Sequence, residues 1–268
     1  MLPVCVLPKI LVPHLAFSLN WPHSIGIYIL TAIVGIVVLV HLFFVTVLFA
    51  ACLLERQYLS GNFEPAEAPF PYEPSPYWKA TREAAIQLGW QHAGDFAIKK
   101  KTSKVRGLLS LFLNADRTVM AAIFSGASVV AKDKRTTLRT GLATGRVLDS
   151  TDSPGTEDLS GVTERAVLLR AGMAELSAFH LRRIENAGAL PVSFSSTASL
   201  ADYQRFDLQK GQRWVQMGLA KWADSQQTSI RMTFRGACGH IKRLFTQMSK
   251  LTQQSERIEI PRAGSRGA

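Results

Sequence analysis

The sequence predicts an α+β fold, with a single N-terminal transmembrane helix followed by a soluble domain. This domain is expected to contain an antiparallel sheet of about four or five strands packed against helices. Three observations predict it. Residues 25–54 contain no Asp, Glu, Lys or Arg. Short apolar runs separated by turn signals fill residues 95–148, as is typical of a strand meander. Helical patterns near Val162 and Ser199 follow the strands.

The apolar run at residues 25–54 is long enough to cross a bilayer, since about 20 apolar residues span a hydrocarbon core of roughly 30 Å. A cleavable signal peptide has a core of only about 7–15 residues, so the run favours an anchor. Residues 49–52 loosely resemble a lipoprotein cleavage box, but the run continues through Leu54. His41 is interpreted as a tolerated polar residue within the span. Residues 1–24 then form an N-terminal tail.

The orientation of the span is predicted from the rest of the chain, because the flanking cations are balanced: Lys9 lies on one side and Arg56 on the other. Of 31 Lys and Arg residues, only Lys9 precedes Glu55, and all 20 acids follow the span, which leaves the soluble part with a net charge of +10. Its only cysteine is Cys238, as expected in a reducing compartment. We therefore expect a cell-membrane protein with its domain in the cytoplasm.

Residues 55–77 are rich in proline and glutamate, and we interpret them as a semi-rigid spacer. A ligand for a proline-binding module is the alternative. A helix is expected at residues 75–88, because Ser75 can cap it, Pro76 suits its first position and Gly89 can end it.

The α+β domain is expected to occupy residues 78–225 and to begin with a meander. We expect strands at residues 95–98, 108–113, 118–124, 128–131, 136–142 and 146–148. Residues 114–117 read as a turn, and residues 143–145 read as a hairpin connection because Gly145 tolerates positive φ.

Two helices are expected after the strands, on one face of the sheet. The first has an apolar stripe formed by Val162, Ala166, Leu169, Met173, Leu176 and Phe179. The second is expected to be capped by Ser199 with Asp202 and to break at Gly211. Its buried face is expected to comprise Tyr203, Phe206, Trp214, Met217 and Trp222.

Two sets of polar residues are interpreted as structural rather than functional. Four acids, namely Asp149, Asp152, Glu157 and Asp158, do not match the calcium-binding loop and are expected to cap the helix beginning near Val162. His180 stands beside Arg182 and Arg183 at the end of that helix, where cations interact favourably with the helix dipole.

Residues 226–251 are expected to form a basic amphipathic helix, followed by a disordered tail at residues 252–268. Its apolar stripe comprises Ile230, Phe234, Cys238, Ile241, Phe245, Met248 and Leu251, and the segment contains no acid. Such a helix either lies in a membrane interface or docks on the sheet with a basic solvent face.

A second basic cluster lies between two expected strands, at residues 99–106. It can contact anionic head groups or nucleic-acid phosphates, or form a solvated loop. The candidate residues for binding an anionic surface are Lys99, Lys100, Lys101, Lys104, Arg106, Arg231, Arg235, Lys242 and Arg243.

No standard catalytic motif is found, and no catalytic residue, cofactor or metal ligand is predicted. The first hypothesis is therefore a non-enzymatic module that contacts a membrane surface, through anionic lipid head groups, or a protein partner. The alternative is a membrane-tethered enzyme, whose site would combine His180 or His92 with a carboxylate in a pocket. A membrane-tethered nucleic-acid binder is the third hypothesis, and the sequence gives no oligomeric state.

Overall fold

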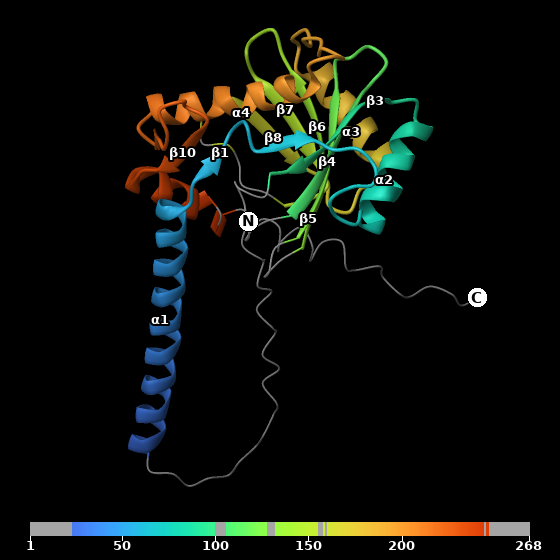
Figure 1. Cartoon of the computed structure of the whole chain (residues 1–268). Helices are drawn as coiled ribbons and strands as arrows, with labels where there is room; N and C mark the ends of the chain where they lie inside the picture. Colours follow the sequence, from blue (N-terminus) through green and yellow to red (C-terminus); the bar gives the residue numbers. More distant parts are fainter. Residues whose placement is uncertain are drawn as a thin grey trace, which may run out of the picture. The chain divides into compact units, whose positions relative to one another are not determined.

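The computed structural model describes residues 23–99, 106–127, 132–154, 158, 160–243 and 245–246 (Figure 1). The chain divides into two compact units, Met1–Cys52 and Leu53–Ala268. The fold class is α+β, as predicted, but the described residues give the main sheet seven strands, which is more than predicted.

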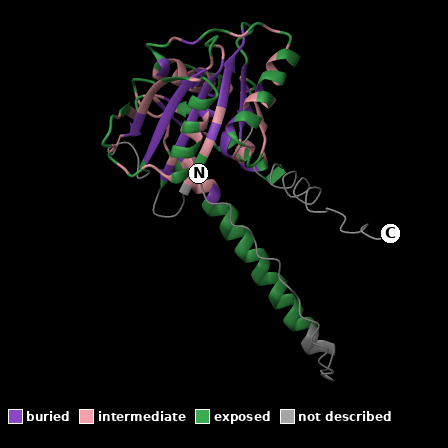
Figure 2. Ribbon diagram, turned by 90° about the vertical axis from the view of Figure 1, so that its right-hand side faces the viewer, coloured by how far each residue is buried: buried purple, intermediate pink, exposed green. Residues whose placement is uncertain are grey.

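Helix α1 (His23–Leu54) contains the apolar run. Its segment Ile27–Leu54 has a mean hydropathy of 2.9 and is long and apolar enough to cross a membrane. Figure 2 shows this helix exposed over most of its length. Thr31, His41 and Thr46 each bond to the carbonyl oxygen four residues earlier, at 2.8 Å. In a bilayer, these bonds would satisfy polar groups for which lipid offers no partner, so the helix itself would accommodate His41.

The main sheet follows the chain in strand order, from β2 to β8. Its strands are β2 (Phe63–Pro65), β3 (Gln91–Ile98), β4 (Arg106–Leu113), β5 (Met120–Ala127), β6 (Lys132–Gly141), β7 (Val147–Thr151) and β8 (Thr163–Val167). Neighbours are antiparallel except β7 and β8, which are parallel. The predicted meander is present, and residues 128–131 lie outside the described residues.

Helices cover both faces of the main sheet, which corrects the expectation of helices on one face. Helices α2 (Pro76–Gln87) and α3 (Met173–Asn186) lie on one face, and α4 (Ser199–Gln216) lies on the other (Figure 1). The reason is that β4 and β5 are apolar on both sides, so each face needs cover. The first core contains Trp78, Phe112, Leu138 and Leu176, and the second contains Leu111, Met120, Phe124 and Phe206.

Helix α2 begins and ends where the sequence predicts. The Ser75 hydroxyl accepts a hydrogen bond from the Trp78 amide at 3.2 Å, and Pro76 occupies the first helical position. Gly89 follows with φ of +77°, the left-handed conformation that ends many helices. All of these signals are local.

Residues 55–77, expected to be a spacer, instead join both sheets of the fold. Strand β1 (Gln57–Tyr58) forms a small antiparallel sheet with β10 (Ser229–Met232) and β9 (Ala220–Trp222), in the order β1-β10-β9. Strand β2 pairs with β3 at the edge of the main sheet. Between them, buried Leu59 lies so close to Gly211 that a Cβ there would be 2.1 Å from the leucine Cδ1. This close approach leaves no room for a side chain at position 211, and α4 continues through Gly211 without the predicted break.

The first expected helix of the second half begins later than predicted. Its amino-terminal part is β8, and α3 begins only at Met173. Arg170 has φ of +60°, which no helix accommodates, and Gly172 is the N-cap. Val162, Ala166 and Leu169 have helical spacing in sequence, but they lie in or beside β8, which is an edge strand of the main sheet.

The predicted cap of the second helix is also corrected. The N-cap of α4 is Ala198, and the Ser199 hydroxyl donates instead to the Ala93 carbonyl oxygen at 2.9 Å. The carboxylate of Asp202 accepts from the Ser195 amide at 2.7 Å. The buried face of α4 includes Phe206 and Trp214, as predicted.

The expected helix at residues 226–251 is shorter than predicted. Residues 229–232 form β10, and helix follows at residues 234–243 and 245–246. The remaining residues up to 251, and the predicted tail at 252–268, lie outside the described residues.

Candidate functional site

The helix at residues 234–243 and 245–246 (the 234–246 helix) is fixed to the domain by small residues. Gly236 and Ala237 are buried, and Ile241 is buried one turn later. A Cβ on Gly236 would lie 1.9 Å from the carbonyl oxygen of Leu219, so the helix backbone packs directly against that chain segment. This contact fixes which side of the helix faces outward.

The outward side of this helix combines aromatic and cationic side chains. Phe234 is 69% exposed and Phe245 is 46% exposed. Arg235, Cys238 and Lys242 are also exposed. At about 100° per residue these five positions share one side of the helix. We call them the apolar-basic face. Exposed aromatic residues flanked by cations are typical of helices that lie in a membrane interface.

The other predicted cations of this segment have different positions. Arg231 is exposed on β10, beside the 234–246 helix in sequence. Arg243 is half-buried, and its guanidinium donates to the Asp158 carbonyl oxygen at 3.2 Å. Arg243 therefore holds the helix to the domain rather than belonging to the apolar-basic face.

The second predicted cluster is described only at its ends. The Lys99 amide donates to the Asn62 carbonyl oxygen at 2.9 Å, just beyond β3. Arg106 begins β4 with an exposed side chain, whose guanidinium lies 6.0 Å from the Tyr72 ring centroid. Lys100, Lys101 and Lys104 lie outside the described residues.

Arg56, at the start of the domain, contacts two residues in or beside the small sheet β1-β10-β9. Arg56 donates to the Ser229 hydroxyl at 2.6 Å and to the Asp224 carboxylate at 2.9 Å. Hydrogen bonds from Ser229 and Thr228 hold the pKa of Asp224 well below its usual range. Arg56, counted above as a flanking cation of the span, is thus an ion-pair partner within the domain.

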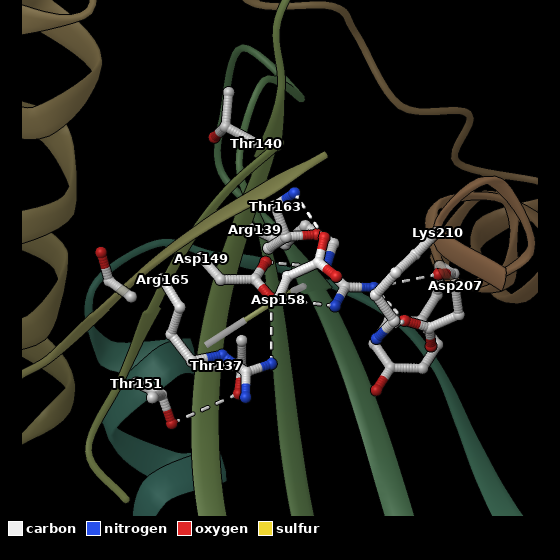
Figure 3. Close-up of polar contacts among 12 residues, drawn as sticks. Thr137, Arg139, Thr140, Asp149, Thr151, Asp158, Thr163, Arg165, Asp207 and Lys210 are labelled. Atoms are coloured by element: carbon white, nitrogen blue, oxygen red, sulfur yellow. Dashed lines mark hydrogen bonds and ion pairs between the residues drawn. The ribbon is translucent and has the colours of Figure 1, made fainter. Parts of the chain in front are cut away.

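Asp149 corrects the interpretation of the acidic residues as a helix cap. Its carboxylate is fully buried on β7 and accepts two hydrogen bonds from Arg139, at 2.9 and 3.0 Å (Figure 3). Arg165 of β8 approaches from the other side at 3.4 Å. Burial alone would raise the pKa of Asp149, but these guanidinium groups hold it well below its usual range. The sequence signal is weak, because Arg139 and Asp149 are ten residues apart on different strands.

Two other acids of that group also serve tertiary contacts. The Asp152 carboxylate accepts from the Tyr77 hydroxyl at 2.6 Å and from the Thr136 amide at 2.7 Å. Asp158 accepts from the Trp214 indole N–H at 2.9 Å and from the Thr163 amide. Among the described residues, no group of three or more His, Cys, Asp and Glu side chains could hold a metal ion.

His180 is a buried neutral residue and not a cation at a helix end, which corrects that interpretation. It lies on α3 with no exposed surface. Its ring nitrogens contact the Thr140 hydroxyl at 3.0 Å and the Ser150 hydroxyl at 2.8 Å. Burial, together with the charge of Arg183, lowers its pKa to about 4. A Ser–His pair with no exposed surface cannot meet a substrate, so this contact is structural.

His92 is the other histidine that the enzyme hypothesis invokes. Its Nε2 lies 3.0 Å from the Asp95 carboxylate, which also accepts from Ser110 at 2.5 Å and from Arg82 at 2.8 Å. Burial alone would raise the pKa of Asp95, but the hydrogen bonds from His92 and Ser110 lower it. A carboxylate-oriented histidine is an arrangement used for general base catalysis. The pair lies on the α2 face of the main sheet. A cavity of about 180 Å³, lined in part by Phe63, Phe124 and Tyr203, lies on the opposite face beside α4.

Comparisons with known proteins do not assign this chain. No family model matches it, no curated protein matches it, and no solved structure matches it. Its function is therefore argued from its own residues.

Proposed function

We propose that this is a single-pass membrane protein whose basic domain contacts an anionic membrane surface through the apolar-basic face. The observation that carries the proposal is the outward exposure of Phe234 and Phe245 beside Arg235 and Lys242. The cations complement anionic head groups, and the aromatic rings suit the boundary between head groups and acyl chains.

Because α1 tethers the domain to the membrane, a weak contact with the membrane surface is sufficient to hold the domain against it. A cation near an anionic leaflet contributes about 1 kcal/mol, which is too little to hold a free domain. Helix α1 keeps the domain at a membrane, so the second contact forms at a high effective concentration. We place the domain in the cytoplasm, because the cytoplasmic leaflet is the anionic one and the soluble part is basic.

Vesicle sedimentation tests this proposal. The sample is Leu53–Ala268, which is a compact unit of the fold and lacks the span. We expect it to sediment with phosphatidylserine-containing vesicles at low salt, and to be released by about 0.5 M salt because exposed charges are screened. Phe234→Ser with Phe245→Ser, and separately Arg235→Gln with Lys242→Gln, should each reduce binding.

The matched control removes two exposed cations from other helices, through Lys79→Gln with Arg182→Gln. It should bind like the natural sequence. Absence of binding at low salt, or an equal loss in the control, would contradict the proposal. Tighter binding to duplex DNA than to vesicles of similar charge would favour the nucleic-acid hypothesis instead.

A further inference from the structure

The small sheet β1-β10-β9 contains the first strand of the domain after α1. Only Glu55 and Arg56 separate Leu54, the last residue of α1, from Gln57, the first residue of β1. An extended chain covers at most about 3.6 Å per residue, so Gln57 lies within about 11 Å of Leu54. Strand β10 pairs with β1 and also with β9 (Figure 1). The small sheet is therefore held within reach of the surface of any membrane that α1 crosses.

Two cations stand directly opposite each other on this sheet. Arg231 of β10 pairs with Lys221 of β9, and both side chains are exposed. The neighbours of Arg231, Ile230 and Met232, are buried, so the two cations share the outer face of the sheet. Cβ atoms of opposite residues are about 4.5–5.5 Å apart, and like charges there repel. Among the described residues, neither cation has an ion pair or side-chain hydrogen bond that offsets the repulsion.

The acids of this region do not neutralise the pair. Residues 53–60 and 213–243, which include the end of α4 packed on β9, contain seven Lys and Arg residues and two acids, Glu55 and Asp224. The Asp224 carboxylate already accepts a hydrogen bond from Arg56 at 2.9 Å. Glu55 is exposed and has no ion pair among the described residues. Cations outnumber acids by five in these segments, so an anion from outside fits the pair.

A phosphomonoester is the anionic group that suits two adjacent cations best. It carries a charge of about −1.5 to −2 near pH 7 and presents three acceptor oxygens. The guanidinium of Arg231 can bind two of these oxygens side by side, and the ammonium of Lys221 can contact the third. A phosphodiester carries a single negative charge, so it offers less to a second cation.

We propose that Arg231 and Lys221 bind the phosphomonoester head group of a membrane lipid, of the phosphatidic acid class. This proposal rests on the proposed membrane contact and names the lipid for which that contact is selective. Helix α1 holds the pair beside lipid head groups, so a lipid reaches it at a much higher effective concentration than a soluble phosphate does.

Native mass spectrometry of the full chain in maltoside micelles tests the proposal. The probes are dioctanoyl phosphatidic acid and dioctanoyl phosphatidylserine, which differ in their head groups. We expect phosphatidic acid to bind at least about fivefold more tightly, because its second charge engages the second cation. Equimolar inorganic phosphate should not displace it, since free phosphate has no acyl chains to keep it in the micelle. Equal affinities for the two lipids, or displacement by inorganic phosphate, would overturn the proposal.

Two variants connect this preference to the cation pair. Arg231→Gln with Lys221→Gln should bring the two lipid affinities within about twofold of each other. Lys221→Glu should also remove the preference while raising the melting temperature, because the new carboxylate can pair with Arg231 across the strands. Lys79→Gln with Arg182→Gln, on other helices, is the control and should keep the natural preference. An unaltered preference in both pair variants would overturn the assignment.

This inference and the proposed function can fail separately. Phe234→Ser with Phe245→Ser should weaken binding to phosphatidylserine vesicles without changing the ratio of the two lipid affinities. Equal lipid affinities with vesicle binding retained would overturn only the lipid assignment. Absence of vesicle binding with the preference retained would contradict only the proposed contact through the apolar-basic face.

Discussion

At the scale of single residues, the hydrogen bonds around His180 define its protonation. The Thr140 hydroxyl donates its only proton to the Thr118 carbonyl oxygen at 3.0 Å, so it accepts from the ring Nε2–H. The other ring nitrogen, Nδ1, then accepts from the Ser150 hydroxyl, which in turn accepts from Arg183 at 2.9 Å. A second proton on the ring would remove the hydrogen bond that Ser150 donates and would place a charge in a buried site beside Arg183, which agrees with a pKa of about 4.

This arrangement makes the stability of the domain depend on pH. The unfolded chain protonates His180 below about pH 6.5, whereas the folded protein resists protonation until about pH 4. The unfolded state therefore binds more protons in this window, and the free energy of unfolding falls as the pH falls. We expect a loss of about 3 kcal/mol from this group between pH 7 and pH 4, measured by urea unfolding with tryptophan fluorescence.

His180→Gln provides the comparison for that measurement. It should be less stable at pH 7, because a glutamine cannot reproduce both ring contacts, but its stability should decline less between pH 6.5 and pH 4. An equally steep decline in the variant would show that other groups cause the pH dependence.

At the scale of elements, the contact between the 234–246 helix and Leu219 gives a second prediction. Gly236→Ala places a Cβ against a backbone oxygen that cannot rotate away. We expect the free energy of unfolding to fall by about 1–3 kcal/mol, although alanine favours helix. Chemical denaturation measures it, and hydrogen exchange should show faster exchange in this helix.

Cys238→Ala is the control, since it changes an exposed position of the same helix. It should alter stability by no more than about 0.5 kcal/mol. Similar losses in both variants would mean that the helix does not depend on its close approach to Leu219.

The elements that the sequence predicts well depend on local signals. Ser75, Pro76 and Gly89 define α2 within a few residues of its ends. By contrast, residues 229–232 look helical in sequence, because their strand partners are remote: β1 precedes them by more than 170 residues. Periodicity over four residues cannot reveal such a partner.

The same limit applies to the candidate sites. Helical spacing predicts Phe234 on the apolar stripe and Arg235 and Lys242 mainly away from it, and the structure exposes all three. It could not show that Arg243 turns to Asp158, which is 85 residues away in sequence. The cavity was not predictable at all, because its walls come from five separate segments of the chain.

At the scale of the whole molecule, orientation is the property to test. Reporter fusions that are active on only one side of the membrane should place the C-terminal end in the cytoplasm and the N-terminal end outside. The physical reason is the attraction between the soluble part, which carries a net charge of +10, and the anionic cytoplasmic leaflet. An active C-terminal reporter outside the cytoplasm would contradict both this orientation and the proposed surface contact.

The path of the chain after α1 also has a mechanical consequence. Strands β1 and β2 are the first elements after α1, and each is at the edge of its sheet. Tension applied through α1 would therefore load the Arg56 contacts first and then peel two short edge strands. Peeling breaks few hydrogen bonds at a time, so it requires less force than shearing a long strand. Because residues 58–63 also wall the cavity, the same pull would open it.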